Sequence, residues 1–172
     1  MRPARHGPTI ASVPPPEPTR AAGRGMDPVV ARRIAWENHR GQRNRFGDPV
    51  IEHVARVVAA VSREARAVAW LHDLFELTPI EPTMLRGHGL TATEGRALRL
   101  LTRGPHEAYR GYVLRIARAR GRAGAIARVV KLADLDDHLA HGRPPPGAPL
   151  YAWARGRVLE HMEVRMSTAL AG

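Results

Sequence analysis

Residues 70–76 read WLHDLFE and place one imidazole and two carboxylates, those of His72, Asp73 and Glu76, within a single helical stretch. Residues three and four positions apart are neighbours on a helix, so these side chains share one end of it. Imidazole nitrogen and carboxylate oxygen suit a hard or borderline divalent cation. Taken alone, the stretch fits equally well an exposed, capped helix C-terminus.

Apolar residues recur at helical spacing on both sides of this stretch, from Val29 onward, and alternating β-branched runs are few. This periodicity predicts helices rather than strands. We expect them over about residues 28–40, 50–61, 63–77, 92–102, 106–119, 122–140 and 150–168. Gly and Pro mark joints between them, as at residues 47–49 and 143–147. The sequence therefore predicts an all-α fold, a single bundle of about six to eight helices.

Residues 1–25 are rich in Pro, Arg and small side chains and show no apolar periodicity. Such a segment cannot bury enough apolar surface to offset the entropy lost on ordering. We expect a disordered tail over residues 1–25 and one domain over residues 26–172. Asp27 suits a helix N-cap, and Pro28 suits the first helical position. Met26, just before them, is a second candidate for the start of the chain.

The composition of the 172 residues excludes several classes of protein. The chain has no Cys, so disulfides and a thiolate nucleophile are excluded, and a metal must bind to His, Asp and Glu. Arg interrupts every apolar stretch well before the roughly 18 residues that a membrane-spanning helix needs. The first residues lack the apolar segment of a secretory signal. We expect a cytoplasmic protein without a membrane partner.

The formal net charge of +11 suggests an anionic partner, because Lys and Arg neutralise phosphate groups. All of the 27 basic residues except Lys131 are Arg, which indicates a compositional bias as much as a basic binding surface. We therefore expect no nucleic-acid partner. The alternative is a basic helical protein that binds nucleic acid, with an affinity that falls with salt and survives the loss of His72.

Two more polar residues lie among apolar helical neighbours. His53 belongs to a predicted helix that is otherwise mainly apolar, where a single histidine is commonly part of the core. Asp134 has apolar residues one and two turns before it, so its carboxylate is predicted to face inward, where it needs a partner. A divalent ion held by His53, His72, Asp73 and Asp134 would satisfy both residues.

Those four residues, in this order and on predicted helices, resemble the metal ligands of the HD-domain phosphohydrolase superfamily. The likeness extends to the hydrolase domain of RelA/SpoT-type alarmone hydrolases, which act on guanosine tetraphosphate. The segments that carry it read NHRGQ at residues 38–42, GDP at residues 47–49, HDLFELT at residues 72–78 and KLAD at residues 131–134. It covers about residues 28–140 and implies an HD-domain bundle of the small, stand-alone kind.

The resemblance also implies a chemistry. One divalent metal ion, most often Mn²⁺, would be held by His53, His72, Asp73 and Asp134, and water would attack a phosphate ester or pyrophosphate there. The implied catalytic residues are Asp73 and Glu76, of which Glu76 would orient or deprotonate the water. The alternative for Glu76 is a carboxylate on the helix surface.

The candidates for substrate binding are Arg45, Lys131, Tyr109, Tyr112, Arg115 and His138. Arg45 and Lys131 match basic positions of the family and are candidates for phosphate contact, although Lys131 fits a helix cap equally well. The stripe formed by residues 109, 112 and 115 resembles the substrate-side helix of small HD proteins, where aromatic and basic groups would meet a base and a phosphate. His138 lies one turn after Asp134 and is expected near the metal.

Other conspicuous side chains are expected to be structural. Trp36, Trp70 and Trp153 bring large apolar groups to helical positions and are predicted to lie in the core. His39 is predicted to be a satisfied structural histidine, and Asp137 is predicted to lie on a solvated face.

The expected function is hydrolysis of a phosphate or pyrophosphate linkage in a small-molecule nucleotide, with the 3′-pyrophosphate of guanosine tetraphosphate as the first substrate. Two departures from the alarmone pattern keep two alternatives open. Residues 44–46 read NRF in place of the basic loop of the family, which favours a nucleotide phosphatase of the 5′-nucleotidase type. Leu77 replaces a second acidic residue, which favours a nucleotide-binding protein without turnover. The sequence does not define an oligomeric state.

Overall fold

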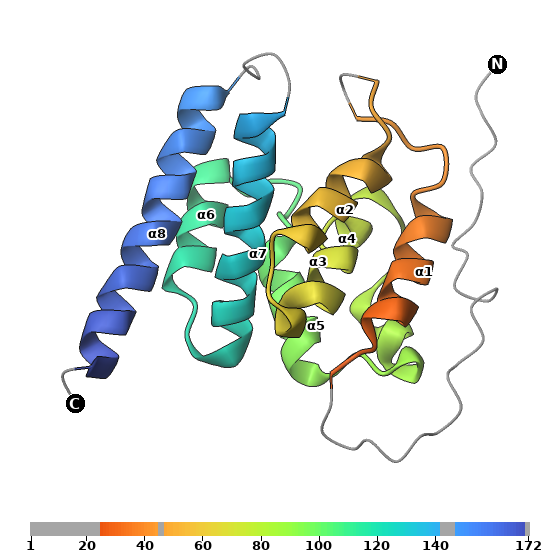
Figure 1. Cartoon of the computed structure of the whole chain (residues 1–172), viewed down its shortest axis with the longest axis horizontal. Coiled ribbons are helices and arrows are strands. Elements are labelled where there is room, and N and C mark those ends of the chain that lie inside the picture. The colour runs from red at the N-terminus through yellow and green to blue at the C-terminus, as the bar shows by residue number, and fades with distance from the viewer. Residues whose placement is uncertain (1–24, 45–46, 142–146, 171–172) are drawn as a thin grey trace.

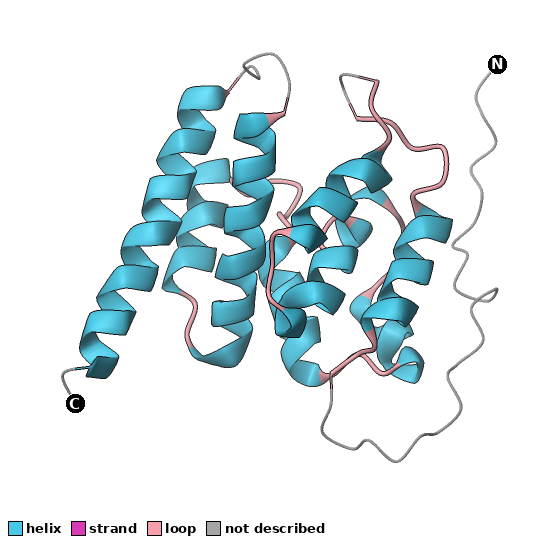
Figure 2. Cartoon of the chain, in the orientation of Figure 1, coloured by secondary structure: helices cyan, strands magenta, loops and turns pink. Residues whose placement is uncertain are grey.

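The computed structural model describes residues 25–44, 47–141 and 147–170, the last seven of them by their backbone alone. All regular structure in these ranges is helical (Figure 2), apart from one isolated bridge between Arg43 and Pro49. The predicted all-α fold is confirmed. The predicted tail over residues 1–25 lies outside the described residues except for Gly25, and so does the candidate Arg45.

Eight α-helices and two 3₁₀ helices follow one another along the described chain (Figure 1). The α-helices are α1 (Pro28–Asn38), α2 (Val50–Ala59), α3 (Arg66–Leu71), α4 (Leu74–Leu77), α5 (Ala92–Leu101), α6 (Tyr109–Arg118), α7 (Gly121–Ala140) and α8 (Ala148–Leu170). The 3₁₀ helices are η1 (Arg63–Ala65) and η2 (Pro82–His88). The apolar periodicity of the sequence does not predict η2. Most predicted helices agree with the structure to within a few residues at each end.

The prediction of one helix over residues 63–77 is wrong, because this segment is divided into η1, α3 and α4. The break between α3 and α4 falls at His72 and Asp73. The His72 side chain donates from Nδ1 to the backbone oxygen of Ala69 at 2.8 Å. In an unbroken α-helix that oxygen would accept from the N–H of Asp73, so the side chain competes with the backbone.

Helix α7 is the centre of the fold. Helices α6, α7 and α8 lie side by side in one half of the molecule, and α1 to α5 form the other half (Figure 1). Helix α7 contacts α2, α3, α5, α6 and α8. Because it is surrounded, its buried residues lie on several sides of the helix rather than along one stripe. Polar residues of α7 can therefore lie inside the protein.

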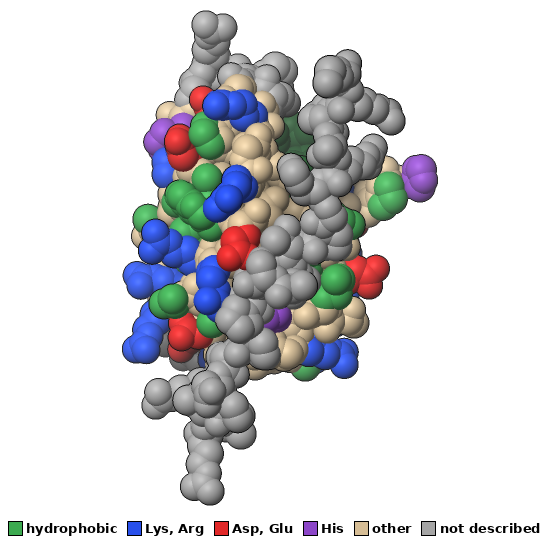
Figure 3. All heavy atoms as spheres, turned by 90° about the vertical axis from the view of Figure 1, so that its right-hand side faces the viewer, with side chains coloured by type: hydrophobic (Ala, Val, Ile, Leu, Met, Phe, Trp, Pro, Cys, Tyr) green, Lys and Arg blue, Asp and Glu red, His purple; other side chains and the backbone are tan. Residues whose placement is uncertain are grey.

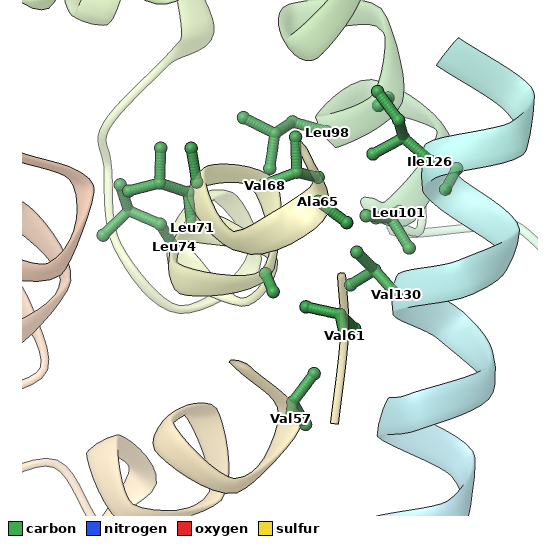
Figure 4. Close-up of a cluster of buried hydrophobic side chains, with 14 of the residues drawn as sticks. Val57, Val61, Ala65, Val68, Leu71, Leu74, Leu98, Leu101, Ile126 and Val130 are labelled. Carbon is green, nitrogen blue, oxygen red and sulfur yellow. The ribbon is translucent and has the colours of Figure 1, made fainter. Parts of the chain in front are cut away.

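The apolar core joins α7 to the other half of the molecule. Figure 4 shows labelled side chains from α2, α3, α5 and α7 that converge on one cluster. Leu71, Leu98 and Val130 in this cluster are fully buried. Burial of one such side chain contributes about 1.5–3 kcal/mol relative to exposure. The cluster thus holds α2, α3 and α7 against one another, and these elements carry the candidate site.

Trp36 corrects the prediction that all three tryptophans lie in the core. Its side chain is 47% exposed, whereas Trp70 and Trp153 are partly buried and pack against the core. Helix α1 packs against α3 and buries Ile34 and Ala35. Trp36 lies outside the buried stripe of that helix, because successive helical residues point in different directions.

Two carboxylates fix the beginning of α1. Asp27 accepts a hydrogen bond from the backbone N–H of Val29 at 2.8 Å, which confirms the predicted N-cap. The buried carboxylate of Glu94, in the first turn of α5, accepts the backbone N–H of Met26 with both oxygens, at 2.9 and 3.1 Å. The beginning of α1 is thereby held beside the beginning of α5.

The described surface is mixed in charge. On the face that Figure 3 turns to the viewer, Lys and Arg side chains lie among acidic, hydrophobic and uncharged ones. Within the described ranges, no helix is both long enough and apolar enough to cross a membrane.

Candidate functional site

Three buried side chains from separate elements meet beside α7. His53 comes from α2, His72 from the break between α3 and α4, and Asp134 from α7. One ligand atom of each lies within 4.8 Å of the other two, and each residue is at most 8% exposed. Imidazole nitrogen and carboxylate oxygen are suitable ligands for divalent cations. This buried group can hold a divalent metal ion.

The ring of His72 is oriented by the backbone. Its Nδ1 lies 2.8 Å from the carbonyl oxygen of Ala69, and a carbonyl oxygen only accepts, so Nδ1 is the donor. Its Nε2 is buried and has no hydrogen-bond partner among the described residues. A buried polar atom without a partner costs free energy. Metal-ligating histidines have this arrangement, with the second ring nitrogen donating to a carbonyl or a carboxylate.

A carboxylate orients His53 in the same way. Its Nδ1 lies 2.7 Å from Oδ2 of Asp137. Its Nε2 lies 3.3 Å from Oδ1 of Asp134 and 3.9 Å from Oδ2 of Asp73. Burial lowers the pKa of His53, but the contacts with Asp134 and Asp137 outweigh burial and raise the pKa to about 10. The carboxylates thus attract positive charge to this place, where a divalent cation would replace the proton.

Asp73 lies at the open side of the group. Its Oδ1 is 3.3 Å from Nε2 of His72, and its side chain is 28% exposed. The buried group that can hold a metal thus contains three of the four predicted ligands, His53, His72 and Asp134, and the fourth, Asp73, lies beside the two histidines. Asp73 is partly exposed, unlike the other three, and it lines the adjoining pocket together with His72 and Asp134.

Two basic groups on α7 contact Asp134. Nζ of Lys131 lies 2.6 Å from its Oδ2, and Nε2 of His138 lies 3.2 Å from its Oδ1. Burial raises the pKa of Asp134, but Lys131, His138 and His53 together outweigh burial and hold the pKa well below its usual range. Asp134 is therefore ionised. Lys131 does not cap a helix, because its ammonium group bonds to this carboxylate.

The prediction that Asp137 lies on a solvated face is wrong, since its side chain is buried. Besides His53, it binds Nε and Nη2 of Arg56, at 2.6 and 3.0 Å. Burial raises the pKa of Asp137, and these two partners lower it well below its usual range. The physical reason is that Asp137 lies three residues after Asp134, so the two carboxylates share the inward face of α7. Sequence reasoning also missed Arg56, although it follows His53 by one turn on α2, and that spacing is the available signal.

A pocket of about 310 Å³ opens beside the metal group, and we call it the metal-side pocket. The sequence-predicted residues that line it are His72, Asp73, Glu76, Tyr109, Tyr112, Lys131, Asp134 and His138. Tyr151 and Arg103 also line it, and sequence reasoning missed both. The ring of Tyr151 stacks on His138 at 5.3 Å between centroids, and His138 stacks on His53 at 4.7 Å. No local pattern marks Tyr151, because its contact depends on how α8 packs on α7.

Glu76 lines the metal-side pocket. Its Oε1 accepts a hydrogen bond from the backbone N–H of Arg103 at 2.6 Å. The residue is exposed, yet partial burial of its carboxyl group raises the pKa of Glu76, against the opposing effect of the hydrogen bond from Arg103. A carboxylate with a raised pKa is a better proton acceptor near neutral pH than an ordinary one. The position of Glu76 is compatible with the catalytic role that the sequence predicts.

The two predicted tyrosines differ in their hydrogen bonds. The Tyr112 hydroxyl is buried and donates to the backbone oxygen of Leu101 at 2.5 Å. The Tyr109 hydroxyl is also buried but has no partner within the described part of the chain. Burial raises the pKa of Tyr109, so the phenol keeps its proton and can donate it in a hydrogen bond. Tyr109 can therefore bind a ligand in the metal-side pocket, whereas Tyr112 supports its wall.

Arg115 does not line the metal-side pocket. Its guanidinium group donates to both carboxylate oxygens of Glu107, at 2.8 and 2.7 Å. It also donates to the backbone oxygens of Arg99, Leu100 and Thr102, at 3.2–3.3 Å. Carbonyl groups at a helix C-terminus lack partners within the helix and readily accept such bonds. Arg115 and Glu107 thus form a hydrogen-bonded brace that holds the end of α5, and Arg115 is not within direct reach of the pocket.

His39 ties the segment before α2 to the residues after the metal group. Its Nδ1 lies 2.8 Å from Oε1 of Gln42, whose Nε2 donates to the backbone oxygen of Leu77 at 3.2 Å. Burial lowers the pKa of His39. Its Nε2 is buried without a partner among the residues described. The prediction of a satisfied histidine thus holds for Nδ1 and is wrong for Nε2.

No protein-family model matches the chain, and no curated protein matches it in sequence. The geometry of the site and the resemblance in its sequence motifs therefore carry the functional inference by themselves.

Proposed function

We propose that the chain is a metal-dependent phosphohydrolase of the HD-domain kind, which cleaves a phosphate or pyrophosphate linkage in a nucleotide. The observation that carries the proposal is the pair of buried Nε2 atoms of His53 and His72, which lack hydrogen-bond partners in the described structure and lie near carboxylates. Each histidine is held through its other nitrogen, as metal ligands are. A ligand set of imidazole and carboxylate is compatible with several divalent metals, and the resemblance implies Mn²⁺ among them.

The proposed chemistry assigns a role to each residue of the metal group. When bound, the metal lowers the pKa of water and offsets negative charge on phosphoryl oxygens. His53, His72, Asp73 and Asp134 would hold it. Glu76 would accept the proton of the attacking water, because its carboxylate lines the pocket and its pKa is raised.

The walls of the metal-side pocket support a nucleotide as the substrate. The aromatic side chains of Tyr109, His138 and Tyr151 line the pocket, so a bound base would lie among aromatic rings. The Tyr109 hydroxyl and the Lys131 ammonium group offer hydrogen bonds to phosphate oxygens. The first substrate that we propose is guanosine tetraphosphate, cleaved at its 3′-pyrophosphate.

The test is product release by the Mn²⁺-loaded protein over a panel of nucleotides that includes guanosine tetraphosphate. Release of pyrophosphate from the alarmone alone supports the proposed substrate. Release of orthophosphate from ordinary monophosphates supports a nucleotide phosphatase of the 5′-nucleotidase type instead. The Asp73→Ala variant is the blank, and equal release by this variant would contradict the proposal.

Further variants separate the metal ligands from the proton acceptor. His72→Ala and Asp134→Ala should each lose both metal retention and turnover, and unchanged metal content by elemental analysis would contradict the ligand assignment. Glu76→Gln should retain the metal and lower turnover about 100-fold or more. If the wild type turns over nothing and Glu76→Gln binds the same nucleotides equally well, the chain is a binding protein without turnover.

A further inference from the structure

A second cavity, of about 570 Å³, adjoins the metal-side pocket, and we call it the arginine cavity. Glu76 and Arg103 line both cavities, so the two spaces meet at these residues. Arg99, in the last turn of α5, lines the arginine cavity but not the metal-side pocket. The chemistry proposed for the metal-side pocket uses neither Arg99 nor the guanidinium group of Arg103.

The arginine cavity carries an excess of positive charge. Arg99 and Arg103 are exposed, and neither guanidinium group has a hydrogen bond or an ion pair with a described residue. Glu76 is the acidic residue that lines this cavity within the described part of the chain. Two arginines and one glutamate thus line the same cavity. Like charges beside one space repel each other, and an anion placed between them would relieve the repulsion.

The backbone that carries the two arginines is fixed in place. Arg115 donates to the backbone oxygens of Arg99 and Thr102, and its partner Glu107 accepts the N–H of Gly104 at 3.2 Å. The backbone N–H of Arg103 is bonded to Glu76 at 2.6 Å. A site whose backbone is ordered before binding loses less entropy when its ligand arrives. The brace around Arg115 thus prepares this turn to present two cations.

We propose that the arginine cavity is a phosphate subsite, in which Arg99 and Arg103 bind a phosphate group of the substrate other than the one that is cleaved. Guanidinium groups form paired, charge-assisted hydrogen bonds with phosphate oxygens. Because Glu76 lies in the wall of both cavities, one ligand can reach from the metal group to the arginines. That the ligand is the substrate rests on the proposed function, whereas the binding of phosphate does not. The substrate class is then a nucleotide with phosphate groups at two separate positions.

The direct test is calorimetric titration of the full, metal-free chain with inorganic pyrophosphate. The wild type is compared with Arg99→Gln, Arg103→Gln and the double variant. Each single substitution should weaken pyrophosphate binding about tenfold, since each removes charge-assisted hydrogen bonds, and the double variant should lose measurable binding. Added salt should weaken the binding to the wild type, because both arginines are exposed.

Two controls locate the binding. Arg118→Gln removes the same charge from an exposed position on α6 that lines neither cavity. His72→Ala removes a ligand of the metal group and leaves the arginine cavity intact. Both variants should bind pyrophosphate as the wild type does. Wild-type affinity in the double variant, lost binding in His72→Ala, or no binding to the wild type would each overturn the subsite.

A kinetic experiment tests whether the occupant is the substrate. With Mn²⁺ present, Arg103→Gln should raise the KM for guanosine tetraphosphate about tenfold, and Arg118→Gln should leave it unchanged. An unchanged KM in Arg103→Gln would overturn the assignment of the cavity to the substrate. Absence of turnover in the wild type would contradict the proposed function, and the calorimetric titration would still decide whether Arg99 and Arg103 bind phosphate.

Discussion

The two halves of α7 both bury charged side chains, and these side chains have different kinds of partner. In the N-terminal half, Arg128 donates to the backbone oxygens of Ala117 and Ala119, at 3.4 and 2.6 Å, where α6 ends. In the C-terminal half, Asp134 contacts Nε2 of His53, a buried nitrogen that lacks a hydrogen bond within the described structure. The first arrangement completes a helix terminus. The second leaves ligand atoms beside a pocket, so burial of a charge is not by itself a sign of function.

A substitution at Asp137 tests the role of the C-terminal half in metal binding. Asp137 accepts a hydrogen bond from Nδ1 of His53 and is not one of the proposed metal ligands. Asp137→Ala removes this acceptor, so the ring of His53 is no longer fixed in its orientation and tautomer. The affinity for Mn²⁺ should fall about 10–100-fold, measured by calorimetric titration. This is the largest effect that we expect from the comparison.

Asp136 provides the matched control on the next residue of α7. Its side chain is 47% exposed and pairs with Arg155. An exposed ion pair contributes at most about 1 kcal/mol, so Asp136→Ala should leave both the fold and the Mn²⁺ affinity nearly unchanged. Equal loss of affinity in the two variants would mean that overall charge, and not the contact with His53, controls metal binding.

A substitution at Gly124 tests the packing of the N-terminal half, because this position has no room for a side chain. A Cβ atom at this position would lie 2.4 Å from the backbone oxygen of Ala119, so the end of α6 or the start of α7 would have to move. Gly124→Ala should lower the free energy of unfolding by about 2 kcal/mol, measured by urea denaturation. The Mn²⁺ affinity of the folded variant should stay at its wild-type value.

Gly111 in α6 is the control for this substitution. A Cβ atom there would meet nothing within 4 Å. Because Ala favours a helix over Gly by up to about 1 kcal/mol, Gly111→Ala should stabilise the protein or leave it unchanged. A Gly124→Ala variant as stable as Gly111→Ala would show that α6 and α7 are not packed as closely at this joint as the structure has them.

The two halves of α7 also differ in how much the sequence reveals about them. Asp134 belongs to the KLAD motif at residues 131–134, and its apolar neighbours predict that it faces inward. Asp137 follows Asp134 by three residues and lies on the same inward face of α7, so the spacing that predicts a buried Asp134 also predicts a buried Asp137. No motif marks Arg128, whose partners lie at the end of another helix.

Contacts between distant residues explain what the sequence could not predict in the rest of the site. The four proposed ligand positions follow from motifs and periodicity, because those signals are local. The break at His72 depends on a side-chain bond to Ala69, which competes with the helix. Tyr151 and Arg103 reach the metal-side pocket through the packing of α8 and the turn after α5, and apolar periodicity carries no information on such contacts.

Arg128→Met should give the smallest effect, since Met replaces much of the apolar stem of the arginine. The backbone oxygens of Ala117 and Ala119 would lose their donor, and the free energy of unfolding should fall by about 1 kcal/mol in urea denaturation. Arg118→Met, at an exposed position on α6, should change it by less than about half that amount. The Mn²⁺ affinity should be unchanged in both variants, because Arg128 lies in the half of α7 that contributes no ligand. A loss of metal affinity in Arg128→Met as large as that in Asp137→Ala would contradict the distinction between the two halves of α7. The N-terminal half would then affect metal binding as much as the C-terminal half does.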